Sequence, residues 1–255
     1  MSERTLLFDV GNTRVKWGLF ERGRISRTGE VTHEKLQQAG YAPLTTRLPR
    51  NVDRILVSNV AGVAFGTRLS GVLGIHCDAD ISFAHTKKEG FGITCAYKQP
   101  RRLGVDRWVA MIGARAEFRS ALCVVDAGTA VTIDTLDRHG RHLGGQIIPG
   151  IDLMGASLAT NTSDLPAVAR SRKPAAAGME MFAATTRGGI RNGAMNAVCG
   201  AIDRAARTMR AAGHRPKVVL TGGDASRILK QLDGNVILRP NLVLQGLARI
   251  AENRS

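Results

Sequence analysis

Two short stretches of the chain have the residue types of a phosphate-binding loop. Residues 9–13 read Asp-Val-Gly-Asn-Thr, and residues 126–129 read Asp-Ala-Gly-Thr. An aspartate at a strand end can hold a cation that neutralises phosphates, often through water. The glycine lets backbone amides turn toward phosphate oxygens, because it has no side chain in the way. The Asn and Thr residues and Lys16 would add further donors.

A single copy of this pattern is also typical of a tight hairpin turn, because Asp, Gly and Asn are the usual turn residues. Two copies at equivalent places in the two halves of the chain favour phosphate binding instead. Gly222, Gly223 and Asp224 form a third glycine-containing loop. That loop could let an adenine and a ribose approach the backbone, although alone it is a common turn between a strand and a helix.

A second kind of motif, which pairs an acidic with a basic residue, is formed by Gly104, Val105, Asp106 and Arg107. One interpretation is a simple helix start, where the helix dipole favours Asp106 in the first turn. The other is a catalytic pair, in which Asp106 accepts the proton of an attacking alcohol and Arg107 binds a substrate carboxylate with two hydrogen bonds. Phosphoryl transfer needs little more than such positioning and charge neutralisation.

Several other catalytic motifs are absent from the sequence. It has no G-x-x-x-x-G-K-[ST], G-x-G-x-x-G, H-E-x-x-H or G-x-S-x-G pattern. His139 and His142 have no third ligand nearby, so we expect both in a surface turn. The cysteines at positions 77, 95, 123 and 199 are too far apart for a CxxC pair, and we expect buried or neutral thiols in a reducing cytosol.

The composition is strongly basic. The 255 residues include 36 Lys and Arg against 21 Asp and Glu, which gives a formal net charge of +15. Such a charge suits a nucleic-acid partner, an acidic substrate or a solvated surface. The arginines are scattered and only 4% of the residues are aromatic, which favours the surface over a nucleic-acid site.

Neither a membrane helix nor a signal peptide is expected. No stretch approaches the ~18 uninterrupted apolar residues that a membrane helix needs. Residues 6–20 are interrupted by Asp9, Arg14 and Lys16, and no small-residue cleavage site follows. We therefore expect a cytoplasmic protein with no membrane partner.

The hydrophobic pattern predicts the same three-stranded unit at the start of each half. Apolar or alternating residues predict strands at 4–9, 14–20 and 24–31, and again at 121–125, 130–136 and 142–148. The recurrence indicates a duplicated fold. Further strands are expected at 54–58, 217–220 and 235–238, and helices at 59–73, 101–118, 151–159, 186–212, 225–231 and 242–252. The alternation of strands and helices predicts an α/β architecture with a mixed sheet in each half.

In this order, the motifs resemble those of type III pantothenate kinases, within the actin/Hsp70/sugar-kinase fold superfamily. Residues 9–16 are similar to the first phosphate motif of that family, residues 104–107 to its G-x-D-R motif, and residues 126–129 to its second phosphate motif. The match covers nearly the whole chain, including residues 144–150 and 165–166. Residues 171–178 are unlike most members and are expected to form a variable loop.

The resemblance implies two duplicated ribonuclease-H-like α/β domains, residues 1–117 and 118–255, with an ATP cleft between them. It implies an enzyme that phosphorylates pantothenate to 4'-phosphopantothenate with ATP, the first step of coenzyme A synthesis, with Asp106 as the catalytic proton acceptor. The implied ATP-binding residues are Asp9, Val10, Gly11, Asn12, Thr13, Arg14, Val15, Lys16, Gly128, Thr129, Gly222 and Gly223. The implied pantothenate-binding residues are Tyr97, Gly104, Val105, Asp106, Arg107 and Thr186.

The resemblance also implies cofactors and a partner chain. ATP would bind with Mg²⁺, and Asp126 would hold a monovalent cation, K⁺ or NH₄⁺. Members of the family are homodimers with the pantothenate site at the interface, and the helix at 186–212 supplies the dimer contact or packs on its own sheet. Thr186 stands seven residues before Gly193, as the family's threonine does, although Thr185 replaces the usual Asn.

Two alternatives to this function remain. A kinase of the same fold could act on another small alcohol. A transcriptional accessory or regulatory protein could keep the fold without the activity, which the net charge of +15 would suit.

Overall fold

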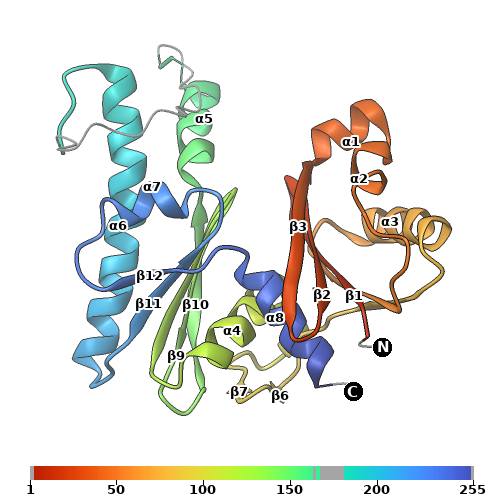
Figure 1. Ribbon diagram of the computed structural model, residues 1–255. Coiled ribbons are helices and arrows are strands. Elements are labelled where there is room, and N and C mark those ends of the chain that lie inside the picture. Colours follow the sequence, from red (N-terminus) through yellow and green to blue (C-terminus); the bar gives the residue numbers. More distant parts are fainter. Residues whose placement is uncertain (1–2, 163–164, 167–180, 254–255) are drawn as a thin grey trace. The chain divides into compact units, whose positions relative to one another are not determined.

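Each half of the chain begins with three consecutive antiparallel strands, as the sequence predicts. The computed structural model describes residues 3–162, 165–166 and 181–253 (Figure 1). The strands are β1 (Thr5–Val10), β2 (Arg14–Glu21) and β3 (Arg24–Thr32) in the first half, and β8 (Leu122–Ala127), β9 (Ala130–Leu136) and β10 (His142–Pro149) in the second. The expected variable loop at 171–178 lies outside the described residues.

Parallel strands complete both sheets in the same way. Strand β4 (Arg54–Asn59) pairs in parallel with β1, and β11 (Lys217–Thr221) pairs in parallel with β8. With β5 (Asp80–Phe83) and β12 (Val236–Leu238), the strand orders are β3-β2-β1-β4-β5 and β10-β9-β8-β11-β12. The matching orders confirm that the fold is duplicated, with one mixed sheet in each copy.

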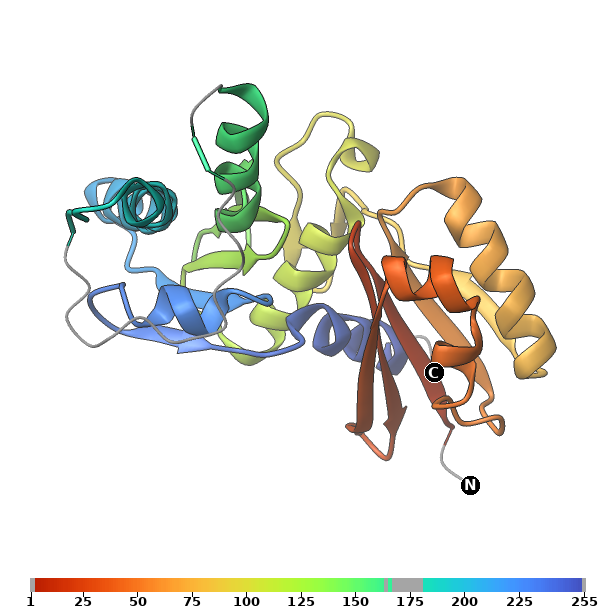
Figure 2. The same ribbon diagram turned by 90° about the horizontal axis from the view of Figure 1, so that it is seen from above.

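Helices cover both faces of the first sheet. Leu6 and Phe8 of β1 belong to one core cluster with Leu36 of α1 (His33–Ala39) and Leu69 of α3 (Val63–His76). Side chains alternate along a strand, so Leu7 points to the opposite face. There α8 (Leu242–Glu252) and α4 (Val105–Glu117) pack, on the other side of the sheet from α1, α2 (Ala42–Thr45) and α3 (Figure 2).

Helices α4 and α8 cross at very close range. A Cβ on Gly113 of α4 would lie 2.6 Å from the carbonyl oxygen of Leu242, and a Cβ on Gly246 of α8 would collide with the carbonyl oxygen of Val109. Only glycine fits at both positions, because the colliding atoms belong to the backbone and cannot change rotamer. This crossing holds α4 tightly against α8.

The second unit buries its own core under a long helix. Cys123, Val125 and Ala127 of β8 pack with Val198 and Ile202 of α6 (Thr186–Ala211). Helices α5 (Ile151–Asn161) and α7 (Ala225–Leu229) both contact α6. By alternation along β8, Asp126 lies on the sheet face opposite to α6.

The chain divides into units differently from the expected 1–117 and 118–255. The first unit contains Met1–Phe118 and Asn241–Ser255, and the second contains Arg119–Pro240. The difference is α8, which groups with the first unit because it packs on α4, β1 and β4. No helix in the described part of the chain has the length and apolarity needed to cross a membrane.

His142 corrects one sequence prediction. Instead of lying in a surface turn with His139, its side chain is fully buried, and Nε2 lies 3.0 Å from Oδ1 of buried Asp134. His142 is the first residue of β10, which pairs with β9, the strand that carries Asp134. All four cysteines are buried, and burial raises the pKa of Cys123 to about 12 and that of Cys199 to about 11, so both thiols are neutral.

Candidate active site

The first phosphate motif forms the tight turn between β1 and β2. The amide of Gly11 donates to the carbonyl of Arg14 at 3.1 Å, which closes the turn. Asp9 and Lys16 are direct cross-strand partners, as are Leu7 and Gly18 two residues further along each strand. Because a Cβ on Gly18 would lie 3.4 Å from Leu244 of α8, this face is the one that α8 and α4 cover. The carboxylate of Asp9 and the ammonium of Lys16 therefore share the α4 side of the sheet.

The other residues of this motif are placed very differently. Val10 and Val15 are buried in the core, so only their backbone groups remain for a nucleotide. Arg14 forms two hydrogen bonds of 3.0 and 3.1 Å to the carboxylate of Glu30 on β3, an ion pair that the sequence did not indicate. Asn12 and Thr13 are exposed at the tip of the turn.

Asp106 lies in the first turn of α4, two positions after Gly104. A glycine at position 104 leaves room for the Asp106 carboxylate. Its Oδ1 accepts a hydrogen bond from the amide of Arg107 at 2.8 Å. A Cβ on Gly104 would stand 2.6 Å from that same Oδ1, so any larger residue would displace the carboxylate. Asp106 is half-buried, with its charge stabilised at the positive end of a 13-residue helix.

The guanidinium of Arg107 is buried beside Tyr97. Arg107 is only 5% exposed, and its Nη1 donates to the hydroxyl of Tyr97 at 3.2 Å. The centre of the guanidinium also lies 5.9 Å from the Tyr97 ring centroid, within range of a cation–π interaction. Tyr97 and Arg107, which the sequence places ten positions apart, are thus brought together next to Asp106.

Two residues that the sequence did not single out hold the segment before α4. The hydroxyl of buried Thr86 donates to the carbonyl of Leu103 at 3.0 Å. The ammonium of Lys88 donates to the carbonyl of Cys95 at 2.8 Å, and the amide of Cys95 donates back to the carbonyl of Lys88. These bonds anchor both sides of the loop that carries Tyr97. Neither residue belongs to a recognisable motif, because each acts through backbone atoms distant in sequence.

The second phosphate motif also lies at a turn between two antiparallel strands, one residue shorter than the first. Asp126 is the fifth residue of β8, as Asp9 is of β1, and the amide of Gly128 donates to the carbonyl of Ala130 at 3.0 Å. The amide of Gly150 donates to the carbonyl of Thr129 at 2.9 Å, and a Cβ on Gly150 would clash with that loop. Thr129 itself is exposed.

Gly222 lies directly against Asp126. A Cβ there would stand 2.5 Å from Oδ1 of Asp126 and would collide with the carbonyl of Ala127. The amide of buried Asp224 donates to the carbonyl of Ala127 at 3.0 Å, and its carboxylate accepts from Arg227 at 2.9 Å. The absent Cβ thus lets the Gly222 backbone pack directly against carboxylate and carbonyl oxygens. Oxygens are the ligand type that hard cations prefer, so the donor chemistry around Asp126 suits a cation.

Thr185 and Thr186 have different roles at the start of α6. Thr185 is the N-cap, and its hydroxyl accepts a hydrogen bond from the amide of Gly188 at 3.1 Å. Thr186 is the first residue of the helix and is exposed. The capping bond occupies Thr185, so Thr186 is the better candidate for binding a ligand.

The predicted site residues therefore form three groups. Asp9 and Lys16 flank the first turn, and Tyr97, Asp106 and Arg107 gather at the start of α4 in the same unit. Asp126, Gly128, Thr129 and Gly222 gather in the second unit, while Thr186 lies on α6.

Two duplicated mixed sheets with an aspartate-containing turn in each define the actin/Hsp70/sugar-kinase fold class. Solved structures share this fold at low sequence identity. A protein from Campylobacter jejuni described as a conserved Baf family transcriptional activator aligns with a TM-score of 0.61 and 19% identity, covering 98% of both chains. A protein from Sinorhizobium meliloti described as a 2-dehydro-3-deoxygalactonokinase aligns with a TM-score of 0.58 and 14% identity, also covering 98% of both.

Sequence comparison defines the family. The family model for type III pantothenate kinase matches residues 5–208. The type III pantothenate kinase of Nitrosococcus oceani is 35% identical over 256 residues, which cover 98% of this chain and 94% of the relative. The chain belongs to the type III pantothenate kinase family.

Proposed function

We propose that this protein transfers the γ-phosphoryl group of ATP to the primary hydroxyl of pantothenate, the first step of coenzyme A synthesis. The observation that carries this proposal is the arrangement of Asp106 beside the buried, Tyr97-bound guanidinium of Arg107 in a chain of this family. It places a proton acceptor next to a cation that suits the carboxylate of pantothenate.

The residues at the start of α4 would orient the acceptor alcohol. Arg107 would bind the pantothenate carboxylate with two parallel hydrogen bonds, a geometry that the planar guanidinium favours. Its bond to Tyr97 holds the guanidinium in one orientation before substrate arrives. Asp106 would then accept the hydroxyl proton as the oxygen attacks the γ-phosphorus in line with the leaving ADP oxygen.

The two phosphate motifs would neutralise the negative charge of the nucleotide. Lys16 would supply a cation, and the turn residues that follow Gly11 and Gly128 would supply donors, since the amides of these two glycines close the turns. Asp9 would position Mg²⁺, which ATP brings and which shields the β- and γ-phosphates. Asp126 would hold K⁺ or NH₄⁺, a charge that would further offset the phosphates.

Consumption of ATP with and without pantothenate tests this proposal. We expect turnover that requires pantothenate and is faster in potassium than in sodium buffer. Turnover that is independent of pantothenate, or none at all with correctly folded protein, would overturn the function. Equal rates in potassium and sodium would overturn the monovalent cation while leaving the kinase activity standing.

Replacing Arg107 by Gln is expected to raise the KM for pantothenate about tenfold or more, because a charge-assisted hydrogen bond contributes about 1.5–3 kcal/mol. The affinity for ATP should change little. Steady-state kinetics with each substrate varied in turn would measure the difference. Arg119→Gln removes an exposed arginine beyond the end of α4 and serves as the control. An unchanged KM for pantothenate in a folded Arg107→Gln variant would contradict the assignment.

The same proposal extends to the assembly and location of the protein. A homodimer would place Thr186 of one protomer at the pantothenate site of its partner, and the exposure of Thr186 supports this role. A cytoplasmic location would give the enzyme access to ATP and pantothenate. Sedimentation with and without pantothenate would measure the oligomeric state.

Two other functions compete with pantothenate phosphorylation. The structural likeness to a protein described as a transcriptional activator, together with the net charge of +15, favours a regulatory role as the second candidate. Steeply salt-dependent DNA binding without kinase activity would support it. ATP turnover with another small alcohol, but not with pantothenate, would indicate a different kinase of the same fold.

A further inference from the structure

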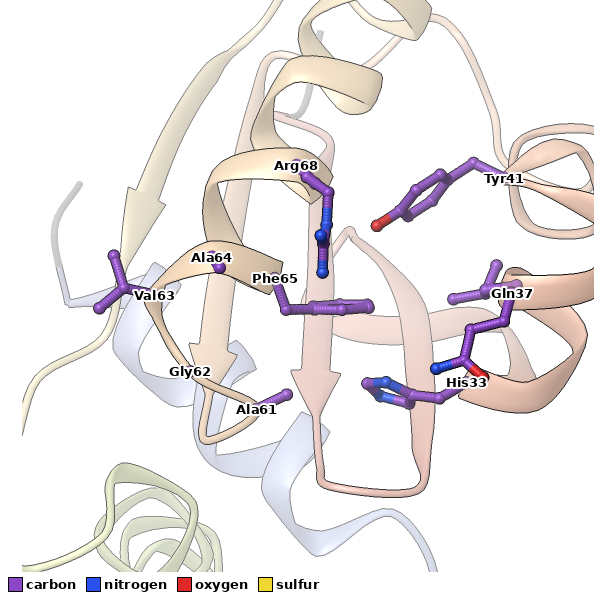
Figure 3. Close-up of a pocket in the computed structure, with 10 residues that line it drawn as sticks. His33, Gln37, Tyr41, Ala61, Gly62, Val63, Ala64, Phe65 and Arg68 are labelled. Carbon is purple, nitrogen blue, oxygen red and sulfur yellow. The ribbon is translucent and has the colours of Figure 1, made fainter.

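A pocket of about 560 Å³ opens between α1 and α3 in the first unit, beside the N-cap of α2. This size lies within the ~300–1,000 Å³ that is usual for small-molecule sites. The side chains that enclose it come from α1, from the residue before α2 and from α3, and include His33, Gln37, Tyr41, Phe65 and Arg68 (Figure 3). None of these residues belongs to the motifs assigned to ATP or pantothenate.

The inner surface of this pocket is aromatic. The rings of His33 and Phe65 pack with centroids 4.5 Å apart, and the Tyr41 ring lies 6.3 Å from that of Phe65. Burial lowers the pKa of His33. A hydrogen bond to the Gly11 backbone raises it by less, so the imidazole is neutral at pH 7. Its buried Nε2 has no hydrogen-bond partner among the described residues. A flat, apolar ligand with a polar edge would suit these walls.

The pocket also carries a single formal charge. Among the described residues that line it, Arg68 is the only one charged at pH 7, and its side chain points toward the same space as the Tyr41 hydroxyl (Figure 3). Gln37 adds an amide, and the first turn of α3 has no side-chain cap on its amides. A cation that lines the same pocket as aromatic rings and neutral donors favours a planar anion over a neutral or cationic ligand.

Both walls of the pocket are bonded to the first phosphate motif through the main chain. The amide of His33, on the α1 wall, donates to the carbonyl of Thr13 at 2.9 Å. The amide of Val60, which leads into the α3 wall, donates to the carbonyl of Val10 at 2.9 Å. The side chain of Asn59 then holds Ala61 and Gly62 with two bonds of 3.0 Å. A ligand that shifts either wall therefore acts on the turn between Val10 and Thr13.

We propose that this pocket is a second ligand site, which binds a planar aromatic or heteroaromatic anion and is coupled to the first phosphate motif. It lies on the sheet face with Leu6 and Phe8, opposite to the face of Asp9 and Lys16, so its ligand does not occupy the nucleotide's place. The coupling to ATP rests on the function proposed above, whereas the binding of the anion does not.

The binding is tested with 2-naphthoate as the probe, on the full chain without ATP. Calorimetry should show saturable binding that weakens about tenfold or more for uncharged 2-naphthamide and for cyclohexanecarboxylate, which lack the charge and the aromatic plane respectively. Arg68→Gln should weaken the binding of 2-naphthoate by a similar factor, while Arg24→Gln, at an exposed position on β3, should leave it unchanged. Circular dichroism would verify that both variants are folded.

Two results would overturn the site. The first is no saturable binding of 2-naphthoate. The second is equal binding by the wild type and folded Arg68→Gln, and if that binding were lost in Lys16→Gln, the probe would lie at the phosphate motif instead. The coupling is tested by the affinity for ATP with and without saturating 2-naphthoate, since coupled sites change each other's affinity by the same factor. An unchanged affinity for ATP would overturn the coupling alone. A protein that binds 2-naphthoate but never ATP would overturn the proposed function and leave the site.

Discussion

Asp106→Asn is expected to slow pantothenate-dependent turnover of ATP by about 10²–10⁴-fold, the range that a positioned general base contributes. The substitution removes the proton acceptor but keeps an amide oxygen where Oδ1 stands, so the 2.8 Å bond from the Arg107 amide can persist. The start of α4, and the position of Arg107 beside Tyr97, should therefore be preserved.

The measurement is a comparison of kcat with the binding of each substrate. Calorimetry should find the affinity for ATP nearly unchanged in Asp106→Asn, because the phosphate motifs are intact. Glu34→Gln is the matched control, since it also removes one carboxylate from the second residue of a helix, here α1. A rate close to that of the wild type in Asp106→Asn would show that another group accepts the proton.

Gly246→Ala should produce the largest loss of stability among the substitutions considered for α4 and α8. The new methyl group would collide with the carbonyl oxygen of Val109, so the two helices must separate. Overpacking a core costs about 1–3 kcal/mol when side chains can adjust, and a backbone collision should reach or exceed the upper end of that range. The better helix propensity of alanine recovers only about 1 kcal/mol.

Thermal denaturation would measure this effect as a decrease in Tm of several degrees. Gly71→Ala is the control, because Gly71 lies inside α3 with nothing within 4 Å of the added Cβ. That variant should be as stable as the wild type or slightly more stable. If Gly246→Ala melted at or above the temperature of the wild type, the close crossing of α4 and α8 would be disproved.

Local patterns were sufficient to predict most elements of this fold. The alternating residues on either side of Gly11 and Gly128 predict the two hairpins, and the residues predicted for the last helix, 242–252, are those of α8. The repeated order of Asp, Gly and Thr also predicted the duplication that the two strand orders confirm. These features depend on neighbours in sequence, and a single chain therefore reveals them.

Elements with little hydrophobic periodicity were missed. Helix α1 has seven residues, of which only Leu36 is buried, and α2 has four. Neither presents a repeated apolar face, so the pattern did not distinguish them from a loop. The pocket formed by His33, Tyr41 and Phe65 could consequently not be predicted from the sequence.

Contacts between distant residues explain the remaining differences. Nothing near Gly246 in the sequence indicates that it packs on Val109, and the assignment of α8 to the first unit depends on that contact. The hydrogen bond from Arg107 to Tyr97 and the ion pair of Arg14 with Glu30 also join residues that no local sequence pattern connects. The motifs predicted which residues belong to the candidate site, whereas the hydrogen bonds that hold their side chains come from the tertiary structure.

The grouping of α8 with the first unit has a consequence for synthesis on the ribosome. Residues 119–240 form one continuous segment and emerge before α8 does. The second unit can therefore complete its sheet on the nascent chain. Helix α4 is synthesised before that unit, but α8, on which it packs, is synthesised after it. The packing of the helix that holds Asp106 and Arg107 is complete only after residues 242–252 have emerged, so we expect this part of the candidate active site to become ordered after the second unit.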